Sequence, residues 1–135
     1  MRYLLDTNIC IYIANHKPQG VAARLQGLKP GDVGMSIITY LELIFGAWNS
    51  RQCEANLERI HDLEQLIPAL PLDTRAGRHY GQLRTELQKK GSPIGAYDLL
   101  IAAHALSLNL ILVTNNLKEF RRISHVRVEN WADTA

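Results

Sequence analysis

The order of apolar and polar positions along the chain predicts short strands that alternate with helices. Residues 2–5 form an apolar-rich stretch, Asp6-Thr7-Asn8 adds residue types that cap helices, and residues 9–14 are apolar again. This order predicts a strand, a turn and a helix. A second short strand is expected over residues 33–37.

Two helices that form a hairpin are expected in the middle of the chain. Residues 39–48 carry apolar side chains at helical spacing, at Leu41, Ile44, Phe45 and Trp48. A second helix follows, with an apolar face made by Cys53, Leu57, Ile60, Leu63 and Ile67. From the sequence alone the apolar face of the hairpin is expected to be mainly core, and Trp48 is expected to be its exposed residue.

The second half of the chain continues the alternation. Pro68 and Pro71 make residues 66–72 suitable for a short edge strand rather than a central one. Helices are expected from Asp73 to about Lys90 and over residues 95–108. The continuous apolar run 110–113 is typical of a strand covered on both faces, and residues 126–128 are a candidate last edge strand.

This alternation predicts an α/β sandwich with a mostly parallel sheet. Ligands of such sheets bind at the carboxyl ends of the strands. Asp6 follows the first strand, and Thr114-Asn115-Asn116 follows the run 110–113. Both segments are therefore expected at the same edge of the sheet.

Length and composition favour one ordinary globular domain. The chain has 135 residues, of which 47% are hydrophobic and 21% charged, enough for a core without disulfides. We expect a single domain over residues 1–135, in a soluble cytoplasmic protein, because no apolar run is long enough for a membrane span and no signal peptide is recognisable. Cys10 and Cys53 lie in apolar stretches and are expected to be reduced core residues.

The formal net charge of +2 does not by itself indicate a nucleic-acid-binding protein. Its distribution is more informative, since Lys118, Arg121, Arg122 and Arg127 are accompanied by the single acid Glu119. Such a segment could contact a phosphate backbone, and it could equally be a solvated basic face.

Four polar positions are unusual among their neighbours: Asp6 at a strand end, Glu42 between two leucines, Asp98 at the start of an Ala/Leu-rich helix, and Asn116 after an apolar run. Each has a structural explanation, as a helix cap, a solvent-facing residue, a partner of the helix dipole or a turn residue. For Asp6, capping alone and a functional role are equally plausible from its position alone.

Together the acids suggest a metal site. If Glu42 and Asp98 converge on Asp6, three carboxylates share a small volume, and at about 5 Å each like-charged pair costs roughly 3 kcal/mol. A cation would offset this repulsion, and oxygen donors without His or Cys point to Mg²⁺ or Mn²⁺. A metal so held can activate water against a phosphodiester. The histidines show no metal-ligand spacing, and His104 lies about 240° around its helix from Asp98.

Four segments, in order along the chain, resemble the VapC-type ribonucleases of the PIN-domain family. They are Leu4-Leu5-Asp6-Thr7-Asn8, Ser36 through Glu42-Leu43, residues 93–105 around Asp98, and Leu112-Val113-Thr114-Asn115-Asn116 with Glu119-Phe120. The resemblance implies a three-layer α/β/α sandwich with a mostly parallel central sheet and a helical hairpin. It implies the toxin of a type II toxin–antitoxin pair, a Mg²⁺- or Mn²⁺-dependent endoribonuclease acting on RNA, with tRNA the leading class.

The resemblance also implies roles for residues. Asp6 and Asp98 match the acids that hold the metal most directly, and Glu42 matches a third acid that acts through water or orients the nucleophile. Thr7, Asn8, Ser36, Thr114 and Asn115 are expected to line or support the site. Many PIN nucleases carry an acid where this chain has Asn115 and Asn116, so we expect one firmly bound metal, with Glu119 a remote candidate for the missing acid.

Partners follow from the same resemblance: a homodimer and a VapB-type antitoxin whose C-terminal segment covers the site. The hairpin of residues 39–67, with Trp48, is where much of that contact is expected. Two other functions stay open. An aspartyl-nucleophile phosphatase would want a second Asp where the chain has Asn8. A non-catalytic PIN-like interaction module would have no need of Asp6, Glu42 and Asp98.

Overall fold

The centre of the fold is a parallel sheet, seen in a computed structural model that describes residues 1–15, 19–123 and 125–132. Its strands are β1 (Tyr3–Leu5), β2 (Val33–Ser36), β3 (Ala69–Leu70), β4 (Ile111–Val113) and β5 (Val128–Glu129). Their order is β3-β2-β1-β4-β5, and every pair of neighbours is parallel. The predicted parallel sheet is confirmed, and the proline-flanked β3 and the late β5 are its two edges.

The helices among the described residues connect these strands. They are α1 (Thr7–Ala14), α2 (Gln19–Gln26), α3 (Ile37–Trp48), α4 (Cys53–Leu66), α5 (Thr74–Lys89), α6 (Ala96–Leu108) and α7 (Leu117–Phe120). The pattern of apolar positions predicted α1, α3, α4, α5 and α6 to within two residues at each end. It did not predict α2 or the four-residue α7, which are short and carry few large apolar side chains from which helical spacing could be recognised.

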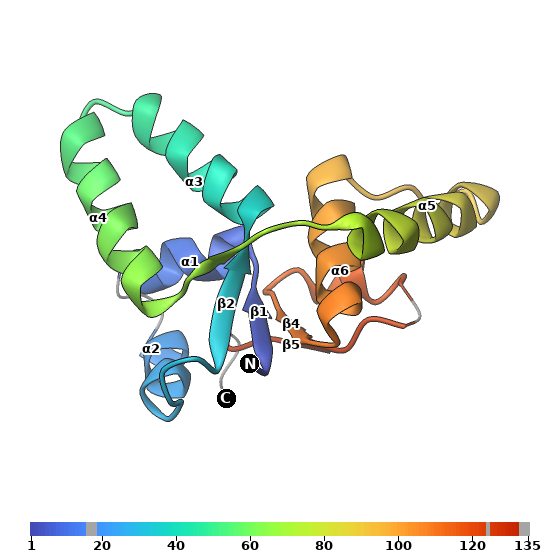
Figure 1. Ribbon diagram of the computed structural model, residues 1–135, viewed down its shortest axis with the longest axis horizontal. Helices are drawn as coiled ribbons and strands as arrows, with labels where there is room; N and C mark the ends of the chain where they lie inside the picture. Colours follow the sequence, from blue (N-terminus) through green and yellow to red (C-terminus); the bar gives the residue numbers. More distant parts are fainter. Residues whose placement is uncertain (16–18, 124, 133–135) are drawn as a thin grey trace.

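Helices cover both faces of the sheet and complete the three-layer α/β/α sandwich (Figure 1). Because successive strand residues point to opposite faces, Leu5 packs with α1, α3 and α4 in one apolar cluster, whereas Leu4 packs with α5 and α6 in the other. Trp131 closes the first cluster and contacts Tyr3 edge to face, with ring centroids 5.1 Å apart. A buried central strand therefore holds two cores together.

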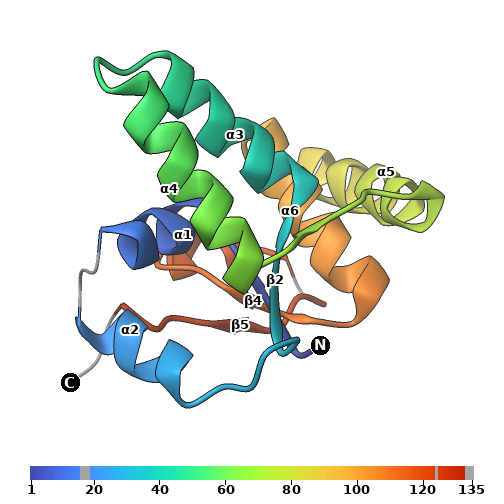
Figure 2. The ribbon, with the colours of Figure 1, turned by 60° about the vertical axis from the view of Figure 1, so that its left-hand side comes forward.

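The helices α3 and α4 form the predicted hairpin and project side by side beyond the sheet (Figures 1 and 2). The expectation that the apolar face of residues 41–48 is mainly core is wrong for this helix. Leu41, Phe45 and Trp48 are 55%, 69% and 68% exposed, whereas Leu43 and Ala47 are buried. Since α3 is apolar on nearly all sides, helical spacing alone could not show which stripe faces α4. The exposure predicted for Trp48 is confirmed.

Cys10 is buried, Cys53 is half-buried, and both are free thiols as expected. No helix within the described ranges is long and apolar enough to cross a membrane.

Candidate active site

The carboxyl ends of three adjacent strands place Asp6, Ser36 and Thr114 side by side. Leu5 is in register with Met35 of β2 and with Val113 of β4, so Asp6, Ser36 and Thr114, which each come one residue later, lie at the same level of the sheet. All three side chains are buried. The edge predicted from the sequence is therefore a row of polar side chains on an otherwise apolar sheet.

Asp6 caps α1 and also belongs to this polar row. Its carboxylate accepts a hydrogen bond from Ile9 N at 3.0 Å, and the side chain is only 5% exposed. Burial raises the pKa of Asp6, the nearby Glu42 carboxylate raises it further, and hydrogen bonds from Thr114 and from the Ile9 and Asn8 backbone oppose this rise. The two explanations considered for Asp6 are thus compatible, because one capping oxygen leaves the other for further contacts.

Glu42 reaches Asp6 from the helix α3. Thr7 Oγ1 donates to Glu42 Oε1 at 2.9 Å and lies 3.3 Å from Thr39 Oγ1, so the first turns of α1 and α3 share a hydroxyl network. Glu42 is half-buried rather than directed fully to solvent. Thr39 is a buried contributor to this network that no feature of the sequence pattern singled out.

Asp98 and Glu119 complete a group of four carboxylates. The pKa of Asp98 is raised to about 6, first by burial, then by the charges of Glu119, Asp6 and Glu42, and by a hydrogen bond with Glu119. Glu119 also accepts from Gly95 N at 3.4 Å. Glu119 comes three residues after Asn116, a spacing that places the two side chains on the same face of a helix. This spacing is the feature of the sequence that could have indicated that Glu119 belongs to the site.

Asn116 acts on Glu119. Its Nδ2 donates to Glu119 Oε2 at 2.5 Å, while its backbone N–H donates to Thr114 Oγ1 at 3.0 Å. The amide at the fourth position therefore holds an acid that comes three residues later. The charge that Asn116 lacks is supplied by Glu119, in contact with Asp98.

The other expected supporting residues lie farther out. The Asn8 side chain is exposed, and only the Asn8 backbone reaches Asp6. Asn115 Nδ2 donates to Tyr12 Oη at 2.6 Å, which ties the turn after β4 to α1. Ser36 caps α3 by accepting from Ile38 N at 3.1 Å.

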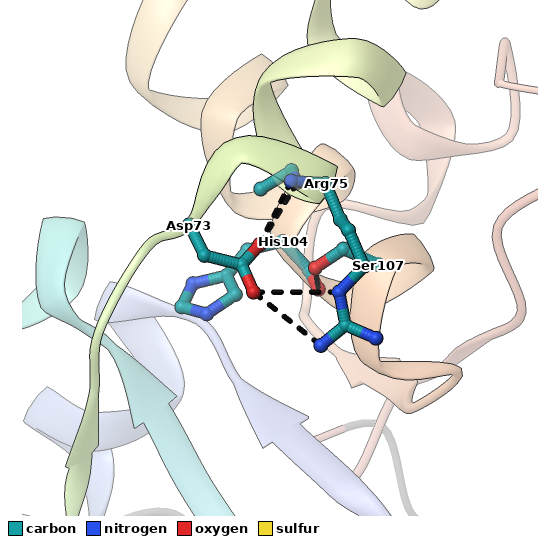
Figure 3. Close-up of polar contacts among 5 residues, drawn as sticks. Asp73, Arg75, His104 and Ser107 are labelled. Atoms are coloured by element: carbon teal, nitrogen blue, oxygen red, sulfur yellow. Dashed lines mark hydrogen bonds and ion pairs between the residues drawn. The ribbon is translucent and has the colours of Figure 1, made fainter.

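Ser36 also joins the sheet edge to a buried histidine. His104 Nδ1 lies 2.7 Å from Ser36 Oγ, and the ring is 1% exposed. Figure 3 shows the ring beside the start of α5, where Asp73 turns its carboxylate toward Arg75. Burial lowers the pKa of His104, so the ring is neutral, and its role is structural. His61, His79 and His125 are at least partly solvent-accessible, and His16 lies outside the described residues.

Glu42 and Asp98 open onto one surface pocket. It is lined by Glu42, Gly95, Ala96, Tyr97 and Asp98, and an adjoining apolar pocket is lined by Ile38, Leu41, Glu42, Phe45 and Tyr97. The exposed Tyr97 and Phe45 side chains therefore border the entrance to the carboxylates.

The donor set fits a hard divalent cation. All four acids supply oxygen, and burial together with the neighbouring carboxylates raises the pKa values of Asp6 and Asp98, so a bound cation would favour their ionised forms. Within the described part of the chain, no three His, Cys, Asp or Glu side chains are arranged so that they could hold a metal ion as they stand. Binding would therefore require the carboxylates to rotate toward the cation, whose charge would offset their mutual repulsion.

Comparison with known proteins places this geometry in context. The model of the PIN domain matches residues 3–126. The chain is 43% identical to the tRNA(fMet)-specific endonuclease VapC of Salmonella typhimurium, over 97% of this chain and 98% of that protein. It is 44% identical to ribonuclease VapC1 of Haemophilus influenzae, with the same coverage. The solved structure of VapBC-1 from nontypeable Haemophilus influenzae superposes with a TM-score of 0.91 at 43% identity, covering 98% of this chain and all of that chain.

Proposed function

Since the chain belongs to the PIN-domain family, and within it to the VapC ribonucleases, we propose that it is a toxin that cleaves RNA endonucleolytically with the aid of Mg²⁺ or Mn²⁺. The observation that carries this proposal is the group formed by Asp6, Glu42, Asp98 and Glu119, in which burial, and then the charges of the other three acids, raise the pKa of Asp98 to about 6. A polyanionic substrate would be repelled by such a group unless a cation were also bound.

Asp6 and Asp98 are the proposed ligands of the metal. When bound, the ion lowers the pKa of a water molecule and offsets negative charge on the phosphate. The cap to Ile9 and the hydrogen bond to Thr114 fix the Asp6 carboxylate before the metal arrives. Asn116 fixes Glu119, which adds a negative charge beside Asp98.

Glu42 is the proposed group that orients the attacking water. Thr7 holds its Oε1 at 2.9 Å, and the Glu42 side chain borders the open pocket that it shares with Asp98. The second carboxylate oxygen can then accept a hydrogen bond from the water and take up its proton as the water attacks. Thr7 thereby contributes orientation rather than chemistry.

A tRNA is the proposed substrate class, since the Salmonella relative is named for tRNA(fMet). The test is cleavage of an initiator tRNA transcript with Mg²⁺ or Mn²⁺. Asp6→Asn should abolish cleavage and keep the cap, because the Asn side-chain oxygen also accepts from Ile9 N. Asp32→Asn is the matched control, since Asp32 likewise accepts a backbone N–H, from Lys29 at 3.1 Å, at the opposite edge of the sheet.

Equal cleavage by the wild type and Asp6→Asn would contradict the assigned site. If the wild type cleaves no RNA offered, the chain is a non-catalytic PIN-like interaction module. A covalent phospho-enzyme at Asp6 would instead indicate the aspartyl phosphatase, because a metal-activated water leaves none.

A VapB-type antitoxin is the proposed partner, because solved relatives were captured as VapBC complexes. Two neighbouring apolar pockets on the α1 and α4 side offer it a surface: one is lined by Ile11, Ala14, Leu43, Ala47 and Ile60, among others, and the second by Ile13, Leu25, Leu63 and Leu66, among others. Arg59 borders both pockets and could pair with an acidic antitoxin side chain. A homodimer is also proposed, and light scattering with and without antitoxin would measure it.

A further inference from the structure

Three basic side chains form one exposed face next to the carboxylates. Lys118, Arg121 and Arg122 are spaced i, i+3 and i+4, and the helical hydrogen bonding of α7 continues through Arg122, so the three lie on one side of this turn. All three are exposed. The ion pairs between described residues are Arg24–Glu129 and Arg75–Asp73, so none of these three cations has a carboxylate partner there.

The single acid of this segment is engaged in the acidic site. Glu119 receives hydrogen bonds from Asn116 Nδ2 and Gly95 N and contacts Asp98. The negative charge of Glu119 therefore lies within the acidic site and does not neutralise Lys118 or Arg121, which are exposed to solvent. The exposed cations of this segment therefore lie directly beside the acidic site.

Arg122 ties this basic face to the segment that leads into α6. Its Nη1 donates to Pro93 O at 3.1 Å, five residues before Asp98. Arg127 does not belong to the face, because its guanidinium binds Asn109 O and Oδ1 at 3.0 and 3.2 Å, before β4 begins. Since β4 and β5 are parallel, Arg127 lies at the amino edge of the sheet, opposite the site. The four cations that are grouped in the sequence are therefore separated in the fold, because Lys118, Arg121 and Arg122 lie beside the site and Arg127 lies at the opposite edge of the sheet.

We propose that Lys118, Arg121 and Arg122 are a phosphate-binding rim that holds the RNA backbone beside the scissile bond. This inference rests on the proposed ribonuclease function. With a net charge of only +2, the chain as a whole attracts RNA weakly, and four carboxylates surround the reacting phosphate, so nearby cations must supply the attraction. Phosphates repeat along a strand and can engage several cations of one face, which suits RNA better than an acidic peptide.

The salt dependence of RNA binding tests the rim. Binding of an initiator tRNA transcript is measured across salt concentrations in an Asp98→Asn background, which prevents cleavage. The rim variant is Lys118→Gln/Arg121→Gln/Arg122→Gln. The control variant is Lys29→Gln/Arg51→Gln/Arg127→Gln, which also removes three positive charges, but at the amino edge of the sheet and at the hairpin tip. Each lost phosphate contact should reduce the slope of log K against log [salt] by about 0.7, and weaken binding roughly fivefold at 0.1 M salt.

In the rim variant the slope of log K against log [salt] should be smaller by about 2 than in the parent protein. With Asp98 restored, the rim variant should show a raised KM and little change in kcat. Equal losses in the rim and control variants would overturn the proposal in favour of net charge alone. Unchanged RNA binding with weakened binding of antitoxin would overturn it in favour of a protein partner. In either case the wild type still cleaves RNA, whereas failure of the proposed function would appear as a wild type that cleaves none.

Discussion

Asn116 donates a hydrogen bond to Glu119 at 2.5 Å and holds it beside Asp98, so that a fourth acid joins a site in which an amide follows β4. The expectation of one firmly bound metal assumed that this charge was missing. With Glu119 in place the site carries four carboxylates, although Glu119 acts through Asp98 and Asn116 rather than from a strand end.

Glu119→Gln should weaken the use of metal. Loss of the carboxylate removes one negative charge from beside Asp98, and groups that support a metal ligand typically alter metal affinity by about tenfold to hundredfold. We expect the Mn²⁺ concentration for half-maximal cleavage to rise by that factor. Glu86→Gln, which changes a partly buried acid on α5, is the control and should leave it unchanged. An unaltered metal requirement in Glu119→Gln would make Glu119 a bystander.

Asp98 should make the metal-free protein less stable as pH rises. Its pKa is about 6 in the folded chain and 3.8 ordinarily, so the folded state binds the proton more tightly, and the cost is absent below pH 3.8 and complete above pH 6. In EDTA, Asp98→Asn should therefore raise the free energy of unfolding at pH 7.5 by about 1 kcal/mol, a value reduced for partial solvent exposure, and by nearly nothing at pH 4. Urea denaturation at the two pH values measures both.

In the presence of Mg²⁺, the wild type should become more stable than Asp98→Asn at pH 7.5. Because the cation replaces the proton at Asp98, it should stabilise the wild type more than Asp98→Asn, and its stabilising effect should weaken below pH 6. A gain that is equal for both proteins would show that the ion binds elsewhere.

Ser36→Ala should destabilise the fold without touching the carboxylates. It removes the cap that receives Ile38 N and leaves the buried His104 Nδ1 without its partner. A lost cap costs about 1 kcal/mol and an unsatisfied buried group about 1–3 kcal/mol. Thermal and urea unfolding should show a loss of about 2–4 kcal/mol. Ser107→Ala, which removes a local bond to His104 O on α6, should cost much less.

His104 should add an acid-side loss of stability. Burial lowers its pKa below 6.5, so the unfolded chain takes up a proton that the folded chain refuses, and stability falls as the pH decreases through 6.5. This slope has the opposite sign to that of Asp98. His104→Gln should remove it, and an unchanged slope between pH 6.5 and 5 would assign the effect to another group.

Trp48→Ser should separate partner binding from folding. The side chain is 68% exposed, so its loss should change the free energy of unfolding by less than about 0.5 kcal/mol. If the hairpin binds the antitoxin, the Kd for antitoxin should rise about thirtyfold, the effect of an aromatic contact worth about 2 kcal/mol. Calorimetric titration measures it, and an unchanged Kd would place the antitoxin away from Trp48.

The sequence by itself determined the alternation of strands and helices, the parallel sheet and the edge where Asp6 and Thr114 lie, because periodicity and strand ends are local properties. It also selected Asp6, Glu42 and Asp98.

Only the tertiary structure decided which further residues join these three acids in the site. Glu119 becomes important through its contact with Asp98, and Arg127 leaves the basic rim because the chain crosses to the opposite edge before β5. Leu43 rather than Phe45 faces the core because α4 packs on one stripe of an evenly apolar helix. Such choices depend on contacts between distant segments, which spacing along the chain does not encode.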